Sequence, residues 1–200
     1  WGVGPGDAIF TTPFTFIATA EVIQLLGATP VFVDIDPLSY NISSELLEKA
    51  ILEVKEAGVL NAKAIIPVDL FGLPADYHTI EKIASKYDLK LLEDAAQGFG
   101  GQIGDRMSGS FGDAASTSFF PAKPLGCYGD GGAIFTDDDS MAQILRSIRA
   151  HGVSDDPYEN IRIGTNARFD AIQAAVLLKK LTIFDKELEE RKKISERLYV

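Results

Sequence analysis

Short apolar runs alternate with amphipathic segments along the first 120 residues of the chain. The run at residues 64–68 ends at a turn with Gly72 and Pro74, and apolar residues then recur at Ile80, Ile83, Ala84 and Tyr87. This spacing is the period of a helix. A second apolar run at residues 89–92 closes at Glu93-Asp94. The three segments predict a βαβ unit with parallel strands and a right-handed crossover.

The same alternation continues on both sides of this unit. Upstream, we expect a strand at 8–11, a helix at 17–26 that stops at Gly27, a strand at 31–34, and a helix capped by Ser43 or Ser44 that runs to Ala57 before Gly58. Downstream, we expect strands at 114–120 and 133–136 and a helix at 139–150 closed by Gly152. Alternating strands and helices are typical of an α/β fold with a parallel sheet.

The last thirty residues form one helical pattern that starts at Ala171. Leu181, Phe184, Leu188 and Leu198 fall on one side of it, and Lys, Glu and Arg stand between them. This pattern predicts a long connecting helix. Since the chain begins at Trp1 without an initiator methionine and stops inside this pattern, we expect it to be an internal fragment.

Composition narrows the function classes. Of 200 residues, 46% are hydrophobic and 24% are charged, which is ordinary for a globular domain. The net charge of −10 disfavours nucleic acids and anionic membranes as partners, because proteins that bind them present clusters of Lys and Arg on their surface. No apolar run reaches the roughly 18 residues of a membrane helix, and no leader opens the chain. We therefore expect a cytoplasmic protein.

Metal and disulfide chemistry find little support. Cys127 is the one cysteine, and the two histidines, His78 and His151, leave few ligands for zinc. Three acids at 137–139 precede a predicted helix, whose positive N-terminus explains them, so we assign no metal. The glycine-rich run at 129–132 lacks the spacing of a Rossmann or P-loop motif and is interpreted as a tight turn.

Two segments combine the groups of a cofactor site. One is Glu93-Asp94-Ala95-Ala96-Gln97 at the end of a predicted strand, and the other runs from Ser116 to Gly126 with Lys123 in a loop. Ligands of α/β sheets bind at the carboxyl ends of strands. Singly, such an acid is more often a cap and such a lysine more often solvated. Together they match pyridoxal phosphate, which needs a lysine amine, a carboxylate for its pyridine nitrogen, and donors for its phosphate.

Longer motifs resemble a known family. They are Gly4-Pro5-Gly6-Asp7, the segments 13–20 and 30–36, Glu93-Asp94-Ala95-Ala96-Gln97, and Ser118-Phe119-Phe120-Pro121-Ala122-Lys123. These resemble the DegT/StrS nucleotide-sugar aminotransferases over residues 2 to beyond 180. The resemblance implies a pyridoxal-phosphate enzyme with the aspartate aminotransferase fold, in which a three-layer α/β/α, mostly parallel sheet forms the large domain of a fold type I transferase.

The resemblance also implies roles for individual residues around the cofactor. Lys123 would form the internal aldimine and later carry the proton. Asp94 would pair with the pyridinium nitrogen, Gln97 would lie against the substituent edge of the ring, Phe16 would stack on its face, and Ser118 would hold the phosphate.

Two further residues extend the implied site beyond the cofactor. Asn166 matches a position that reaches the phosphate of the neighbouring subunit, which implies a homodimer. Arg168 would help to bind the anionic substrate. The domain division that the resemblance implies is a large domain at 1–170, lacking its N-terminal segment, and a connecting helix at 171–200 toward a small domain absent from the chain.

The implied reaction is amino transfer from glutamate to a nucleotide-linked keto-sugar. The string from Ser118 to Phe135 is most similar to members that aminate C3 of a UDP-linked N-acetylated 3-keto-hexuronic acid for surface polysaccharide. Two alternatives stay open. One branch of the family dehydrates sugars, with histidine in place of Lys123, and an inactive fragment would act only as a structural domain.

Overall fold

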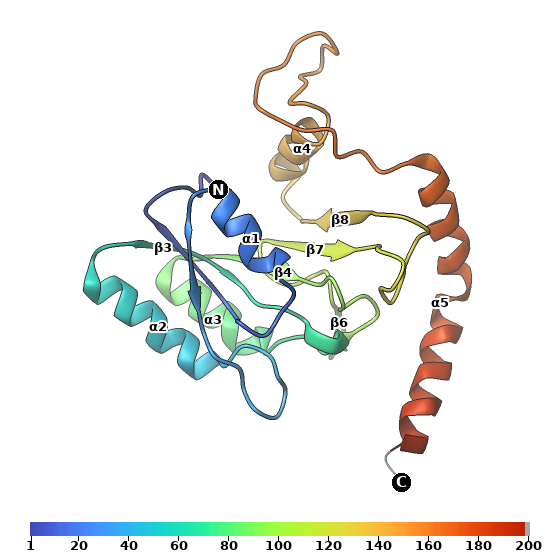
Figure 1. Ribbon diagram of the computed structural model, residues 1–200, viewed down its shortest axis with the longest axis horizontal. Coiled ribbons are helices and arrows are strands. Elements are labelled where there is room, and N and C mark those ends of the chain that lie inside the picture. The colour runs from blue at the N-terminus through green and yellow to red at the C-terminus, as the bar shows by residue number, and fades with distance from the viewer. Residues whose placement is uncertain (199–200) are drawn as a thin grey trace. The chain divides into compact units, whose positions relative to one another are not determined.

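The computed structural model describes residues 1–198, in two compact units. Unit 1 is Trp1–Thr117, and unit 2 starts at Ser118. Figure 1 labels their helices and strands. Among the described residues, no helix is long and apolar enough to cross a membrane.

Unit 1 alternates strands and helices, as the hydrophobic pattern predicts. Its elements are β1 (Asp7–Thr11), α1 (Ala18–Leu25), β2 (Thr29–Phe32), α2 (Ser44–Ala57), β3 (Asn61–Ile66), the 3-10 turn η1 (Leu70–Gly72), α3 (Tyr77–Tyr87), β4 (Lys90–Asp94), β5 (Gln102–Ile103), β6 (Arg106–Met107) and β7 (Ala114–Ser118). Five strands pair in the order β2-β1-β3-β4-β7, all parallel. The predicted βαβ unit is confirmed as β3-α3-β4.

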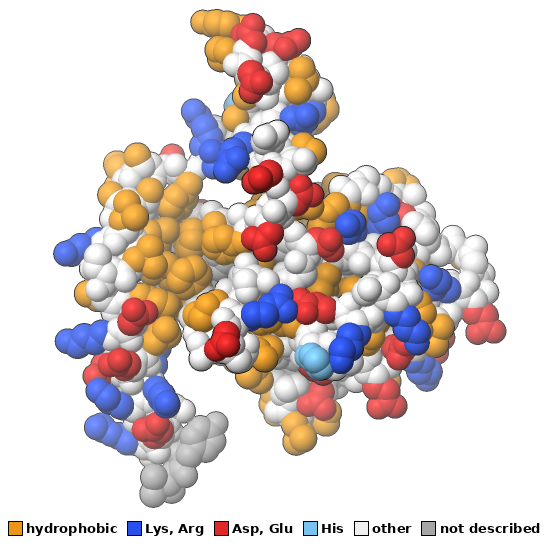
Figure 2. Space-filling model, turned by 180° about the vertical axis from the view of Figure 1, so that it is seen from behind, with side chains coloured by type: hydrophobic (Ala, Val, Ile, Leu, Met, Phe, Trp, Pro, Cys, Tyr) orange, Lys and Arg blue, Asp and Glu red, His pale blue; other side chains and the backbone are white. Residues whose placement is uncertain are grey.

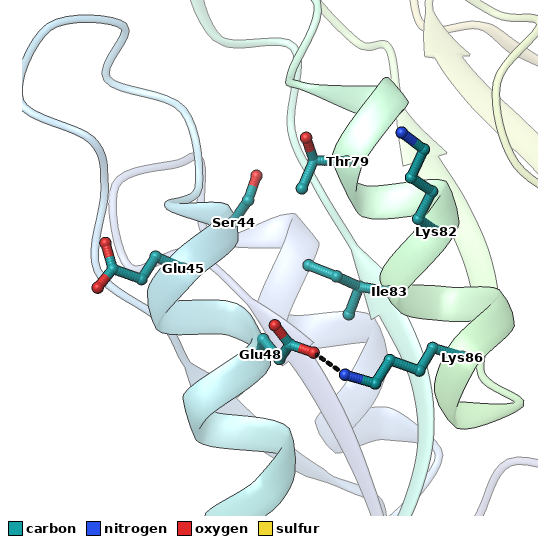
Figure 3. A pocket seen from close by; sticks show the side chains of 7 residues that line it. All are labelled: Ser44, Glu45, Glu48, Thr79, Lys82, Ile83 and Lys86. Atoms are coloured by element: carbon teal, nitrogen blue, oxygen red, sulfur yellow. Dashed lines mark hydrogen bonds and ion pairs between the residues drawn. The ribbon is translucent and has the colours of Figure 1, made fainter.

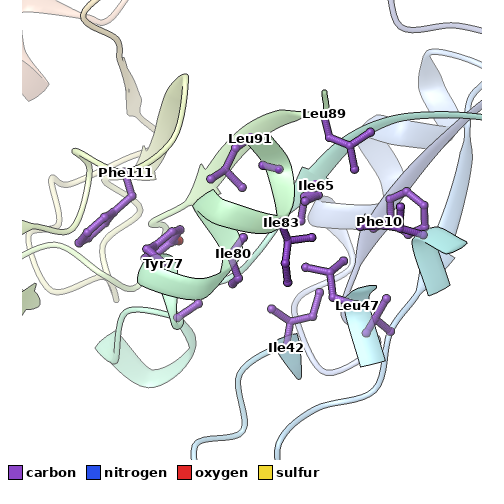
Figure 4. Packing of buried hydrophobic residues seen from close by; sticks show 14 of the residues in the cluster. Phe10, Ile42, Leu47, Ile65, Tyr77, Ile80, Ile83, Leu89, Leu91 and Phe111 are labelled. Carbon is purple, nitrogen blue, oxygen red and sulfur yellow. The ribbon is translucent and has the colours of Figure 1, made fainter. Parts of the chain in front are cut away.

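Helices cover both faces of this sheet. Alternate residues of a strand face opposite sides, so Phe10 of β1 joins a core with α2 and α3, while Ile9 packs on the other side with Ile23 of α1. Figure 4 shows the larger core, in which Leu47 of α2 and Ile80 of α3 are fully buried. The predicted three-layer α/β/α arrangement is confirmed for unit 1.

Local capping defines the ends of the helices on the larger core. The Ser43 side chain accepts a hydrogen bond from Leu46 N at 3.3 Å, so Ser43 rather than Ser44 caps α2. Gly58 ends this helix with a φ of 64°, a conformation that suits glycine. Figure 1 shows α2 and α3 side by side, and Lys86 of α3 bonds Glu48 of α2 at 2.7 Å.

Several strand bounds differ from the predicted ones. β2 is Thr29–Phe32 rather than 31–34, and β3 begins at Asn61 rather than 64. Polar residues extend these strands because their backbones pair with β1, at Ala8↔Thr29 and Asp7↔Asn61. An apolar pattern does not reveal such pairing. The pattern also does not predict the antiparallel β5-β6 hairpin, whose short strands are exposed and are defined by backbone pairing alone.

Unit 2 contains β8 (Gly132–Phe135), α4 (Asp139–Ile148) and α5 (Ala171–Leu198). The Asp138 side chain accepts hydrogen bonds from Ser140 N at 2.8 Å and Met141 N at 3.1 Å. The interpretation of these acids as helix N-terminal residues is therefore confirmed for Asp138. The helix ends at Ile148, two residues before the predicted end.

The long C-terminal helix is confirmed from Ala171 to Leu198, and residues 199–200 lie outside the described residues. Figure 2 shows hydrophobic side chains over its N-terminal half and charged ones over its C-terminal half. The predicted apolar stripe is only partly right, because Phe184 is buried while Leu181 is 44% and Leu198 79% exposed. The domain division at residue 170 stays a prediction.

The core of unit 1 leads to a stability prediction. Leu47 is 0% exposed, whereas Leu38 is 89% exposed. We expect Leu47→Ala to lower the free energy of unfolding by about 2–5 kcal/mol, because it removes buried methyl groups and leaves a cavity. The matched change Leu38→Ala should alter it by less than about 0.5 kcal/mol. Urea unfolding measures both, and equal effects would contradict the described packing.

Candidate functional site

Asp94 is the last residue of β4 and is half-buried. Its Oδ2 accepts a hydrogen bond from Thr19 Oγ1 at 2.8 Å, and its Oδ1 accepts one from Ala96 N at 3.1 Å. Thr19 is 5% exposed, and its hydroxyl also lies 2.9 Å from that of Thr15. An ionised carboxylate has about four acceptor sites. The two bonds therefore hold Asp94 in place and leave sites for a cationic ligand group.

Neighbouring strand ends fix the backbone on both sides of Asp94. Its N–H donates to Pro67 O at 2.9 Å, and its carbonyl accepts from Asp69 N at 3.0 Å. On the other side, Ala95 N donates to Ser116 O at 2.8 Å. These contacts come from the segments after β3 and within β7, so the sheet itself determines where the carboxylate lies.

Phe16 and Gln97 belong to the same unit as Asp94. Phe16 lies just before α1 and is 70% exposed, so its ring is available to a ligand. Its carbonyl accepts from Thr19 N at 3.2 Å, which places it one turn before the residue that holds Asp94. Gln97 follows β4 and is half-buried. The ring stacking and edge contact predicted for these two residues stay predictions.

Lys123 lies in unit 2, in a tight loop after β7, and is half-buried. Its N–H donates to Phe120 O at 2.9 Å. The loop is closed where Cys127 N donates to Phe119 O at 2.8 Å and Phe119 N donates to Gly131 O at 2.7 Å. Cys127 is 0% exposed, and its thiol lies 3.0 Å from Phe119 O, so its role is to fill this loop.

Close packing makes the loop around Lys123 rigid. A side chain at Gly126 would come within 2.5 Å of Pro121 O, so only glycine fits there. The helix α5 binds the loop's backbone, since Lys180 Nζ donates to Gly126 O and Arg191 donates to Pro124 O at 3.3 Å. These contacts fix the backbone on the C-terminal side of Lys123.

Ser118, Asn166 and Arg168 are the other predicted site residues of unit 2. Ser118 Oγ accepts from Phe120 N at 3.2 Å and retains its hydrogen as a donor. Asn166 and Arg168 are exposed, and Arg168 Nε donates to Asn166 Oδ1 at 3.1 Å. A guanidinium has five N–H donors, so Arg168 keeps donors for an anionic group.

The structure thus brings Asp94 together with Thr19, and Asn166 together with Arg168. Thr19 is a functional candidate that the sequence reasoning missed, although it stands within the conspicuous segment 13–20. The sequence feature that could have indicated Thr19 is a hydroxyl at the start of a predicted helix. Such a residue is not distinctive, because Thr is common at helix N-termini as a capping residue. The contacts of all predicted site residues with a cofactor stay predictions.

An open groove on unit 1 is a different feature. Figure 3 shows its lining side chains, which come from α2 and α3, and the ion pair between Glu48 and Lys86. The groove has a volume of about 530 Å³, and the ion pair has a length of 2.7 Å. It lies on the face of α2 and α3, and none of the seven predicted site residues lines it. Exposed ion pairs of this kind contribute little to stability and are screened by salt. The groove is therefore not the candidate site.

Comparisons with known proteins agree with the motifs. The sequence model of the DegT/DnrJ/EryC1/StrS aminotransferase family matches residues 1–199. The UDP-2-acetamido-2-deoxy-3-oxo-D-glucuronate aminotransferase of Pseudomonas aeruginosa is 53% identical over 97% of this chain and 52% of its own. The chain spans about half the length of the curated relatives it matches.

Solved structures extend the likeness to the fold. A DegT/DnrJ/EryC1/StrS aminotransferase from Brucella abortus has a TM-score of 0.97 and 56% identity, covering 98% of this chain and 52% of that one. NtdA from Bacillus subtilis, solved with bound cofactor PMP, has a TM-score of 0.81 and 33% identity, covering 92% of this chain and 40% of that one.

The contact between Thr19 and Asp94 leads to a second prediction. We expect Thr19→Val to lower the free energy of unfolding by about 1.5 kcal/mol or more, because it removes a hydrogen bond to a charged acceptor without changing the shape of the side chain. Thr29→Val, at an exposed position of β2, is the matched control and should have a small effect. Chemical unfolding measures both. A Thr19→Val protein as stable as the control would contradict the described bond.

Proposed function

Because the chain belongs to the DegT/DnrJ/EryC1/StrS aminotransferase family, we propose that the protein transfers an amino group from glutamate to a nucleotide-linked keto-sugar with the help of pyridoxal phosphate. The observation that carries this proposal is the Asp94 carboxylate, held by Thr19 and Ala96 at the carboxyl end of β4. Ligands of parallel α/β sheets bind at this end of the strands.

The residues present fit pyridoxal phosphate. An acceptor-only carboxylate with free lone pairs suits the protonated pyridine nitrogen, a half-buried lysine suits the aldehyde, and hydroxyl and amide donors suit the phosphate. When bound, the cofactor supplies an electron-accepting ring. Asp94 would hold the proton on the ring nitrogen, and Phe16 would cover the ring face. Gln97 would lie at the ring edge, and Ser118 would bind the phosphate.

Lys123 is the proposed general base and acid. Its amine takes the proton from the α-carbon of glutamate and later returns a proton to the sugar carbon that receives nitrogen. Lysine suits both tasks, since its pKa responds to its surroundings, whereas arginine stays charged. The closely packed loop contributes by fixing the backbone from which the Lys123 side chain extends. A sugar dehydration would use histidine at this position, so Lys123 favours amino transfer.

The proposed acceptor is the C3 ketone of a UDP-linked N-acetylated 3-keto-hexuronic acid, used for surface polysaccharide. The 53% identity to a relative named for such a substrate supports this assignment. The exposed Arg168 guanidinium supports it as well, because it can bind a carboxylate or diphosphate. We further propose that the protein works in the cytoplasm as a homodimer, in which Asn166 binds the phosphate held by the neighbouring subunit.

Trapping of the cofactor on a lysine tests the proposed role of Lys123. After incubation with pyridoxal phosphate and reduction with borohydride, we expect peptide mass spectrometry to find the phosphopyridoxyl group on Lys123. Lys123→Arg should lose the label, since a guanidinium does not form the bond. Lys180→Arg controls for other amines, because Lys180 contacts Gly126 of the same loop. A label that stays on other lysines in Lys123→Arg would refute the assignment.

Product analysis tests the reaction. With glutamate and the keto-sugar, we expect an amino-sugar and 2-oxoglutarate in equal amounts. Lys123→Ala should lower the rate by about 10²–10⁴-fold, the usual contribution of general acid–base catalysis. A deoxygenated sugar in place of an amino-sugar would show that the protein dehydrates its substrate.

A further inference from the structure

Glu93, the residue before Asp94, faces the opposite side of the sheet and lies in a buried polar cluster. Asp69 and Glu93 are both 0% exposed. Asp69 Oδ1 accepts from Tyr77 OH at 2.8 Å and from Ala75 N at 3.2 Å. Glu93 Oε1 accepts from Gly109 N at 2.6 Å, and its Oε2 accepts from the N–H of residue 111 at 2.9 Å. Three of the four carboxyl oxygens thus accept a hydrogen bond from a backbone N–H group, and one of the three also accepts from the Tyr77 hydroxyl.

Ser108 connects the two acids. Its Oγ is hydrogen-bonded to Asp69 Oδ2 and lies 2.8 Å from Glu93 Oε1. A hydroxyl has one hydrogen, so it cannot donate to two carboxylates at once. One of the two bonds therefore needs a hydrogen from a carboxyl group. Asp69 Oδ2 is the oxygen that accepts from no backbone N–H among the described residues, and it is the place where a proton fits.

We propose that Asp69 and Glu93 share one proton through Ser108, and that this buried pair acts as a set of positioning residues for Asp94. In this arrangement Asp69 Oδ2 donates to Ser108 Oγ, and Ser108 donates to Glu93 Oε1. Every hydrogen then has an acceptor. The part of the proposal that concerns Asp94 rests on the proposed function of that residue.

The charges around the pair explain why it retains a proton. Burial raises the pKa of Asp69, and burial together with Asp69 raises the pKa of Glu93 to about 7. Burial and the two acids also raise the pKa of Tyr77, so its hydroxyl stays a donor. Two unpaired buried carboxylates would cost a large desolvation free energy. Asp94, the third acid that acts on Tyr77, adds a further negative charge.

Arg106 of β6 forms its ion pair with Glu81 and not with either acid of the pair. Arg106 binds Glu81 through two hydrogen bonds of 2.9 and 2.8 Å, and its guanidinium lies over the Phe111 ring at 4.4 Å. Its own pKa is raised chiefly by Glu81 and only lastly by Glu93. With this cation engaged elsewhere, a shared proton is the means by which the cluster reduces its negative charge.

The cluster is joined to Asp94 through the backbone. The N–H of Asp69 donates to Asp94 O at 3.0 Å, and Glu93 precedes Asp94 in β4. A side chain at Gly98 would collide with Ser108 Oγ and Asp69 Oδ2, so the segment after Asp94 also packs directly on the cluster. Loss of the proton would place two charges behind this strand end and loosen it.

Substitution of Asp69 by Asn is the closest copy of the protonated acid. Its amide nitrogen, placed at Oδ2, can donate to Ser108, while its oxygen keeps the bonds from Tyr77 and Ala75. Glu93→Gln is the matched variant that does not fit, because both Glu93 oxygens face backbone N–H groups and an amide nitrogen would oppose one of them. We expect Glu93→Gln to unfold at clearly lower denaturant than Asp69→Asn.

The pH dependence of unfolding tests the shared proton. The two acids titrate as a pair, so the pKa of about 7 at Glu93 describes the loss of their shared proton. The folded state therefore holds one proton more than the unfolded state between about pH 5 and 7. The unfolding equilibrium constant of the unchanged protein should therefore rise about tenfold per pH unit across this window, relative to Asp69→Asn. This slope should flatten above about pH 7. Equal slopes in the two proteins would overturn the shared proton, and so would a Glu93→Gln protein as stable as Asp69→Asn.

A cofactor measurement tests the link to Asp94. We expect pyridoxal phosphate to dissociate more readily from the unchanged protein when the pH rises from about 6 to 8.5, by a larger factor than from Asp69→Asn, since the variant cannot lose this proton. An equal change in both would overturn the positioning role. If neither protein bound the cofactor at any pH, the proposed function would fail, whereas the unfolding slopes would still decide on the proton.

Discussion

The parallel pairing of β4 between β3 and β7 determines what its last two side chains can do. Successive residues of a strand face opposite sides of the sheet, so Glu93 and Asp94 enter different surroundings although they are neighbours in the chain. Asp94 meets the hydroxyl of Thr19 on α1. Glu93 meets Ser108 and two backbone N–H groups in the layer that contains α3. One strand end thus combines an accessible carboxylate with a buried carboxyl pair.

Asp94 and Glu93 differ in their exposure to water. Asp94 is half-buried and accepts hydrogen bonds from a hydroxyl and one N–H, which leaves acceptor sites for a cationic ring nitrogen. Glu93 and Asp69 are fully buried and lie close together. A pair that keeps one proton therefore has a lower free energy than a pair of two charged carboxylates. In an acidic protein with a net charge of −10, this proton also limits the negative charge behind the proposed site.

Unit 2 positions its lysine by a different means. The Lys123 loop has little regular structure. Its shape depends on a glycine that packs against a carbonyl, on a buried thiol, and on hydrogen bonds that side chains of α5 donate to the carbonyls of the loop. Lysine is a flexible side chain, and a mobile loop would spread its amine over many positions. Close packing of the loop lowers this cost for the proposed proton transfers, because the ordering is already achieved when the substrate binds.

Sequence alone was sufficient for features that depend on neighbours along the chain. The spacing of Ile80, Ile83 and Ala84 predicted α3, and Gly58 marked the end of α2, because helical periodicity and capping act within a few residues. The motifs around Asp94 and Lys123 predicted the family in the same way. The tertiary structure alone revealed the bond from Thr19 to Asp94, the sharing of Ser108 by Asp69 and Glu93, and the start of β3 at a polar residue. These contacts join residues 15 to 75 positions apart, and such contacts form only when the sheet has paired and the helices have packed on it.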